Sequence, residues 1–140
     1  METKKKTLRD SISNVLEEMF FLVEETPPDD IVEKYDYVTF INDKMFVANL
    51  YLNASLAGEI TENFLGLFDP PEEDDILDCL QEVVNMMAGN FVGAVYPDHE
   101  KLLPFPKAER FSGSLPDDSY DKDLIFYKGQ PLAVYFKSIK

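Results

Sequence analysis

The stretch from Ile76 to Phe91 constrains the fold more than any other part of this sequence. Successive residues of an α-helix are rotated by about 100°. At that rotation the apolar side chains of the stretch fall within about 60° of one direction. They are Ile76, Leu80, Val83, Val84, Met87 and Phe91. A stripe of this width is typical of a helix that packs on a hydrophobic core, and it predicts such a helix here.

The opposite side of this helix carries a second pattern. Asp78, Glu82, Asn85 and Gly89 follow one another at i, i+4, i+7 and i+11, so they form one row, which we call the polar row. The sequence has no Lys or Arg over residues 71–98, so the row lacks the ion pairs that usually stabilise a solvated helix face. Asn and Gly are also poor helix formers. A docking surface for another molecule explains these residues, and a solvated face is the alternative that the pattern leaves open.

The remaining elements are helices and hairpins that stay separate along the chain. Apolar periodicity predicts helices over residues 8–25, with Met19 and Val23 on the core face, and over 58–68. Runs rich in Tyr, Val, Phe and Leu predict two hairpins, 32–41 with 45–55 and 124–127 with 132–139. The order is close to one unit used twice. It favours a layered α+β fold, with long helices on a largely antiparallel sheet and an internal pseudo-repeat, in a single domain of residues 1–140.

Net charge limits the classes of partner. The chain has 13 Lys and Arg against 27 Asp and Glu, which gives a net charge of −14 at pH 7. Nucleic acids and anionic membranes need a basic protein surface, so this charge argues against both. The sequence contains neither an apolar run of the roughly 20 residues that a transmembrane helix requires nor a recognisable signal peptide. We therefore expect a cytoplasmic protein.

Metal and redox chemistry find little support in the sequence. Cys79 is the only cysteine and His99 the only histidine, so neither a disulfide nor a metal site built from such ligands is expected. Four carboxylates at residues 72–75 lack the ligand alternation and the central Gly of an EF-hand loop. Their position before the long helix indicates a favourable interaction with the helix dipole instead.

The polar row also resembles a known signature. Asp78-x3-Glu82-x2-Asn85, followed by Ala-Gly-Asn and later by prolines, is similar to the motif of the CheC/CheX/FliY phosphatases of bacterial chemotaxis. That motif has Asp or Ser, three residues, Glu, two residues, Asn, and a more distant Pro. Pro104 and Pro106 both lie closer than the family's proline, so neither is assigned its role.

The resemblance extends over essentially the whole chain, and the element order and length are those of CheX. The first helix carries Ser13-x3-Glu17-x2-Phe20, which repeats the spacing with Phe in place of Asn. CheC and FliY have two working copies of the motif, whereas CheX has one, on the second long helix. The chain therefore resembles CheX, and we expect the first copy to be a solvated helix flank without chemistry.

This resemblance implies a reaction and a partner. The reaction is hydrolysis of the aspartyl phosphate on a CheY-like response regulator, which brings its own Mg²⁺ and Lys, so no cofactor of this chain's own is implied. Asn85 would orient the attacking water, because an amide can accept and donate hydrogen bonds together. Glu82 would pair with the regulator's Lys, and Asp78 and Gly89 would contribute to partner binding.

Two further expectations concern assembly and the alternative function. The resemblance to CheX implies a homodimer, and a last hairpin that ends just after Tyr135 and Phe136 predicts a terminal strand open to pairing. The alternative function is a non-catalytic module that binds a phosphorylated receiver, as in flagellar switch proteins. A domain that binds a small ligand has no motif to support it.

Overall fold

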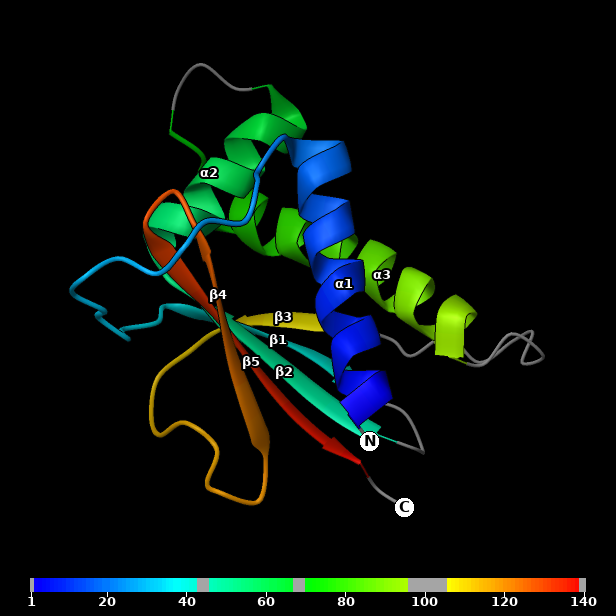
Figure 1. Ribbon diagram of the computed structural model, residues 1–140. Coiled ribbons are helices and arrows are strands. Elements are labelled where there is room, and N and C mark those ends of the chain that lie inside the picture. Colours follow the sequence, from blue (N-terminus) through cyan, green and yellow to red (C-terminus); the bar gives the residue numbers. More distant parts are fainter. Residues whose placement is uncertain (1, 43–45, 67–69, 96–105, 139–140) are drawn as a thin grey trace.

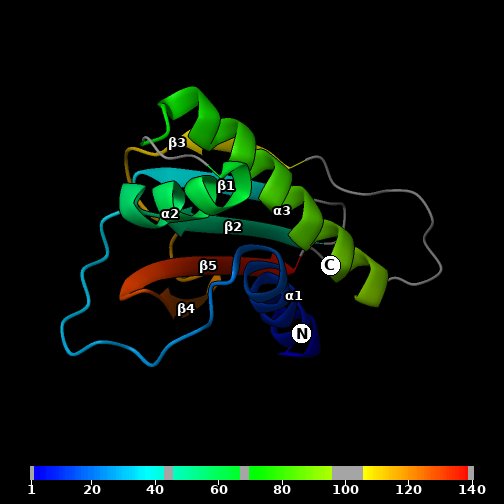
Figure 2. The ribbon, with the colours of Figure 1, turned by 90° about the horizontal axis from the view of Figure 1, so that it is seen from above.

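The computed structural model describes residues 2–42, 46–66, 70–95 and 106–138 (Figure 1). Within these ranges the chain forms three helices and five strands. In order they are α1 (Glu2–Phe20), β1 (Tyr37–Asn42), β2 (Phe46–Leu52), α2 (Ala54–Leu65), α3 (Glu73–Val95), β3 (Lys107–Arg110), β4 (Asp121–Tyr127) and β5 (Gln130–Ser138). The strands form one antiparallel sheet in the order β3-β1-β2-β5-β4. The helices lie over one face of this sheet (Figure 2), so the predicted layered α+β fold is confirmed.

The predicted repeat is visible in the order of the elements. A long helix and a hairpin come first, as α1 with β1 and β2, and the pattern returns as α3 with β4 and β5. The two hairpins meet at the centre of the sheet, where β2 pairs with β5 and Leu50 faces Val134. Each long helix packs beside the hairpin of the other half. Helix α3 contacts β1, and Arg9 of α1 donates to Asp123 of β4 at 2.7 Å. The two halves therefore share one core.

This core lies between the helices and the sheet. All six apolar residues of the predicted stripe on α3, from Ile76 to Phe91, are buried there. The ring of Phe91 packs edge-on against Phe46 with centroids 4.9 Å apart, and Phe46 stacks on Phe136. Aromatic pairs of this kind add to the stabilisation that burial itself gives. The stripe thus anchors α3 on β2 and β5, one strand from each half.

Helix α1 spans residues 2–20 and not the predicted 8–25. Phe21 follows it with a φ of 59°, a left-handed conformation that is rare for an aromatic residue. The chain reverses there, and the N–H of Leu22 donates to the carbonyl of Leu16 at 2.9 Å, as at a Schellman helix end. The sequence predicted that the helix would end at Pro27 and Pro28. It ends earlier, at Phe21, because this residue adopts the left-handed conformation, which a Phe does not signal in a sequence.

The early end of α1 changes the exposure of two residues. Met19 and Val23 were predicted to face the core, and both are exposed. Only the part of the stripe between Leu8 and Leu16, together with Phe20, is buried as a helix face.

Helix α2 spans residues 54–65 where the sequence predicted 58–68, because capping residues set both ends. The Oδ1 of Asn53 accepts from the N–H of Leu56 at 2.8 Å and caps the N-terminus. Gly66, with a φ of 66°, ends the helix in the left-handed conformation that glycine adopts without strain.

Both predicted hairpins are present, with shifted bounds. Strand β1 begins at Tyr37, five residues after the predicted start, and β4 begins at Asp121, three residues before it. The second hairpin turns through Lys128 and Gly129, both with positive φ, which is the geometry that suits the right-handed twist of a two-residue hairpin.

The place of β5 corrects one prediction. The terminal strand was expected to be open to pairing, but β5 lies inside the sheet and pairs with β2 on one side and β4 on the other. Both sides of β5 are therefore already paired with neighbouring strands. In the described part of the chain the edge strands are β3 and β4.

Candidate functional site

The polar row lies along the outer face of α3, opposite the buried stripe. Asp78, Glu82 and Asn85 are exposed there, and Gly89 is half-buried. Within the described part of the chain the side chains of Glu82 and Asn85 take part in no hydrogen bond or ion pair. The structure therefore brings all four predicted site residues together on one surface, with the carboxylate and the amide accessible to a partner.

The helix that carries this row is held firmly at its N-terminal end. Glu73, Asp74 and Asp75 stand in its first turn, where negative charge interacts favourably with the helix dipole. The carboxylate of Glu73 also accepts from Arg110 of β3 at 2.5 Å. Together with the buried stripe, these contacts make α3 a rigid support, which is what precise placement of side chains on a partner requires.

Cys79 borders the row but is not suited to nucleophilic chemistry. Its side chain is buried, and burial raises the pKa of its thiol to about 11, a rise to which the neighbouring carboxylate of Glu82 contributes and which the Thr61 hydroxyl opposes. The group is therefore a neutral thiol at physiological pH, whereas a reactive cysteine is a thiolate.

The first copy of the motif is not a second site. Ser13 lies within hydrogen-bond distance of Glu24 at 3.2 Å and of the Tyr127 hydroxyl at 3.3 Å. Phe20, which stands where the amide would be, is fully buried against the ring of Phe64. Only Glu17 is exposed. The three positions thus have different surroundings and form no accessible row, although Ser13 is a packed residue and not the solvated flank that was expected.

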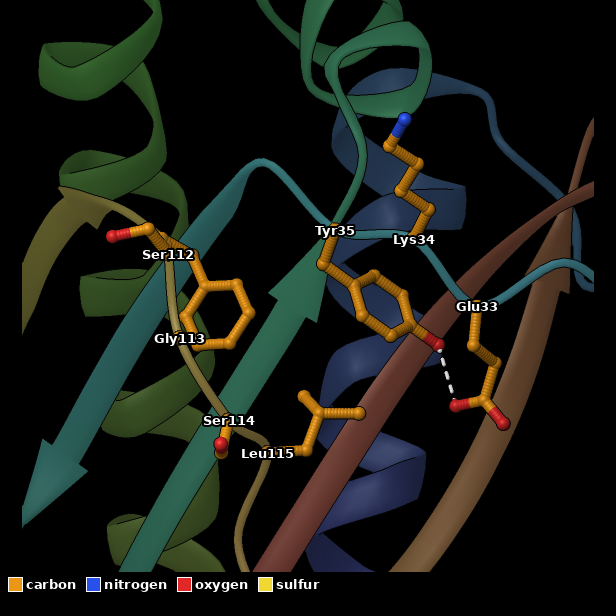
Figure 3. Close-up of a pocket in the computed structure, with 8 residues that line it drawn as sticks. Glu33, Lys34, Tyr35, Ser112, Gly113, Ser114 and Leu115 are labelled. Carbon is orange, nitrogen blue, oxygen red and sulfur yellow. Dashed lines mark hydrogen bonds between the residues drawn. The ribbon is translucent and has the colours of Figure 1, made fainter.

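A pocket on the other face of the sheet offers a rival location (Figure 3). It has a volume of about 470 Å³ and lies between residues 33–35 and 111–115. Two of its titratable groups are already paired: the Tyr35 hydroxyl donates to Glu33 at 2.9 Å, and Glu33 also accepts from Lys122 at 2.7 Å. The Lys34 ammonium points away from this pair (Figure 3). We see here a loop packed over aromatic side chains of the sheet, without a nucleophile placed beside a base.

Several predicted features lie elsewhere or outside the described residues. His99 and Pro104 fall outside the described ranges, and Pro106 is buried directly before β3. In the described ranges no group of three His, Cys, Asp or Glu side chains is placed to hold a metal ion. None of the helices in those ranges is long and apolar enough to cross a membrane.

Comparisons with known proteins identify the fold. No family model matches the sequence, and no curated protein matches it. Among solved structures, the chemotaxis protein CheX from Vibrio vulnificus matches with a TM-score of 0.74 at 16% identity, over 97% of this chain and 96% of that one. A CheX–CheY–BeF3–Mg²⁺ complex from Borrelia burgdorferi matches with a TM-score of 0.71 at 13% identity, over 97% of both chains.

A more distant match belongs to FliM. The middle domain of FliM from Helicobacter pylori has a TM-score of 0.56 at 10% identity, over 96% of this chain and 86% of that one. At these identities the likeness shows the fold. The chain has the fold of CheX, and the resemblance read from the polar row is confirmed at that level.

Proposed function

We propose that this chain, as a CheX-like member of the CheC/CheX/FliY family, hydrolyses the aspartyl phosphate of a CheY-like response regulator. The observation that carries the proposal is the exposed pair Glu82 and Asn85, one turn apart and free of hydrogen bonds within the described residues, on a helix of a CheX fold. The structural neighbour from Borrelia burgdorferi was solved with CheY, BeF3 and Mg²⁺, which supports a partner of this class.

In the proposed mechanism the chain contributes position and not a new reactive group. The partner holds the acyl phosphate, its Mg²⁺ and a Lys. Asn85 accepts a hydrogen bond from water and donates one to a phosphoryl oxygen, which places the water in line with the phosphorus. Holding the water in this geometry lowers the activation barrier, because the entropy of bringing the reactants together has already been lost on binding.

Glu82 fixes the orientation of docking in this proposal. Its carboxylate pairs with the Lys of the partner in a charge-assisted hydrogen bond, one turn from Asn85. Asp78, one turn further back, contacts the surface of the partner. Gly89 leaves room for the backbone of the partner, because an added Cβ would meet no atom within 4 Å beyond the adjoining turns of its own helix.

The second candidate function is binding without hydrolysis. The match to the FliM middle domain shows that a fold of this kind occurs outside the CheX and CheC-like proteins as well. The presence of both Glu82 and Asn85 favours the enzyme, because a module that only binds has no need of an amide placed one turn from the carboxylate.

Two further proposals follow from the same likeness. We place the protein in the cytoplasm and expect a homodimer, as the resemblance to CheX implies, with pairing of an edge strand, β3 or β4, in place of β5. Light scattering at micromolar concentration measures the assembly, and a species with only the monomer mass of 16.1 kDa would contradict the dimer.

The decay of a phosphorylated CheY-like receiver, with and without this protein, tests the proposed activity. We expect faster decay with the wild type and a loss of two or more orders of magnitude in Asn85→Ala if water orientation is the main contribution. Asn85 is exposed, so its removal changes the free energy of unfolding by no more than about 0.5–1 kcal/mol. Asn90→Ala is the matched control, since Asn90 is also exposed on α3 but lies off the polar row.

Three outcomes of this assay are informative. Equal activity of Asn85→Ala and the wild type would mean that the row is not catalytic. Binding of the receiver without any acceleration of decay would favour the non-catalytic module. Loss in Asn85→Ala with full activity in Asn90→Ala supports the phosphatase.

A further inference from the structure

Exposed apolar side chains gather where α1 and α2 end. Met19, Phe21 and Val23 at the end of α1 are 54%, 82% and 60% exposed, and Phe64 and Leu65 at the end of α2 are 39% and 44% exposed. We call these five residues the apolar patch.

The two helix ends that carry the patch are joined. The rings of Phe20 and Phe64 lie 5.6 Å apart, and the Nδ2 of Asn63 donates to the carbonyl of Phe20 at 2.9 Å. Figure 1 shows both ends side by side above the sheet. The patch therefore lies on two helix ends that are held together by these contacts.

Phe21 is placed at an energetic disadvantage. It has a φ of 59°, which a bulky side chain adopts only with strain, and its ring is directed into solvent. A glycine at this position would end α1 in the same way without strain. Strain that is not relieved by packing in the isolated chain suggests a role for the ring in a complex.

The helices that carry the patch pack against α3, the helix that carries the polar row. Thr61 of α2 interacts with Cys79, which lies three residues before Glu82 on α3. Helix α1 also contacts α3, and the view from above shows the ends of α1 and α2 next to the middle of α3 (Figure 2). The ends of α1 and α2 therefore lie beside the helix that carries Glu82 and Asn85, within the span of one docked protein domain.

The charges around the patch indicate which kind of surface would bind it. Glu17, Glu18 and Glu62 are exposed beside it. The cations that the fold brings to these elements already have partners, since Arg9 pairs with Glu24 and Lys128 with Glu59. A second copy of this chain would bring the same acidic rim into contact with itself, and an anionic membrane would be repelled as well. An apolar protein surface bordered by Lys and Arg fits both the patch and its rim.

We infer that the apolar patch is the second contact of the receiver that docks on the polar row, and that it binds an apolar surface of that receiver bordered by basic residues. This inference rests on the proposed function. The row acts on the phosphorylated site, whereas the patch contributes affinity beside it. Aromatic residues that become buried at the contact with a partner commonly provide much of the binding energy.

The test measures affinity and turnover separately. The probe is a CheY-like receiver of the same organism loaded with beryllofluoride and Mg²⁺, titrated by calorimetry, and turnover is followed with the phosphorylated receiver. Phe21→Asn removes the ring and keeps a residue that tolerates the left-handed conformation, so the fold is preserved. Leu65→Gln changes the other helix, and Val32→Asn, at an exposed apolar residue of the loop before β1, is the matched control.

We expect Phe21→Asn and Leu65→Gln each to raise Kd about tenfold, equivalent to about 1.4 kcal/mol, with kcat at saturating receiver unchanged. Val32→Asn should leave Kd unchanged. An unchanged Kd in both patch variants would overturn the inference, while normal turnover in the same samples would still support the proposed function. A change of oligomeric state in place of a change in Kd would assign the patch to a second copy and overturn it too. Absence of receiver binding by the wild type would refute both proposals.

Discussion

Replacement of Gly89 by Ala should change stability and the proposed activity in opposite directions. Gly89 lies in the interior of α3, and a Cβ built there meets no atom within 4 Å. Glycine in a helix interior is less favourable than alanine by about 0.5–1 kcal/mol. The chief reason is that a chain with glycine has more conformational freedom when unfolded and loses more of it on folding. Gly89→Ala should therefore raise the free energy of unfolding by that amount and the Tm by about 1–4 °C.

The same substitution should impair the proposed activity. A methyl group extends the helix surface by on the order of 1.5 Å, the length of one carbon–carbon bond. Gly89 lies four residues from Asn85, or about 6 Å along the helix axis, so a partner displaced at one position is displaced at the other. Misplacement of about 1 Å can reduce a rate about a hundredfold. We expect kcat/KM for the phosphorylated receiver to fall about ten- to a hundredfold while the protein becomes more stable.

Thermal unfolding and receiver dephosphorylation, measured on the same preparations, check both parts. Gly58→Ala is the matched control, because Gly58 is also a helical glycine with open space around its Cβ position, but it lies on α2. It should gain the same stability and keep full activity. A more stable Gly89→Ala with unimpaired dephosphorylation would refute close approach of the partner, and a less stable one would refute the argument from open space.

Three further predictions concern the first copy of the motif and the behaviour at alkaline pH. Glu17→Ala should leave dephosphorylation unchanged, whereas Glu82→Ala should weaken docking and turnover by about 2–5 kcal/mol if its pair with the receiver's Lys is buried; equal losses would indicate two sites. Phe20→Asn should create no second site and should lower the free energy of unfolding by about 3–5 kcal/mol in a urea titration, because the ring is fully buried. Burial raises the pKa of Cys79 to about 11 and also raises that of Tyr127. The unfolded chain therefore releases these protons at a lower pH than the folded chain does. The free energy of unfolding should then fall as pH rises from about 9 to 11, and a urea midpoint unchanged between those pH values would contradict this.

On α3, residues whose place depends on local periodicity were predicted correctly from the sequence. The stripe and the polar row of α3 follow from a rotation of about 100° per residue, so the buried face and the exposed face could be assigned before any contact was known. The hairpins follow from short apolar runs and turn residues in the same way. The roles of the four residues of the polar row come from the resemblance instead, and they stay predictions.

Features that depend on distant parts of the chain were missed. Strand β5 is internal because β2, some 80 residues earlier, pairs with its free side, and no pattern within β5 shows this. Ser13 is held by Tyr127, which is 114 residues away. The end of α1 at Phe21 was missed for a related reason: the usual signal, a glycine, is absent, and the burial of Phe20 by α2 fixes the end instead.

The proposed mechanism depends on geometry. Beside the polar row the only cysteine is buried and neutral, so it is not a nucleophile for this reaction. In the proposal the acceleration comes from placing water and partner groups, and the amide of Asn85 supplies most of it. On the same proposal a Phe in place of Asn is enough to make the first copy inactive, and restoring the amide at Phe20 would not make it active. The position faces the core and the ring of Phe64, so no water and no receiver can reach it.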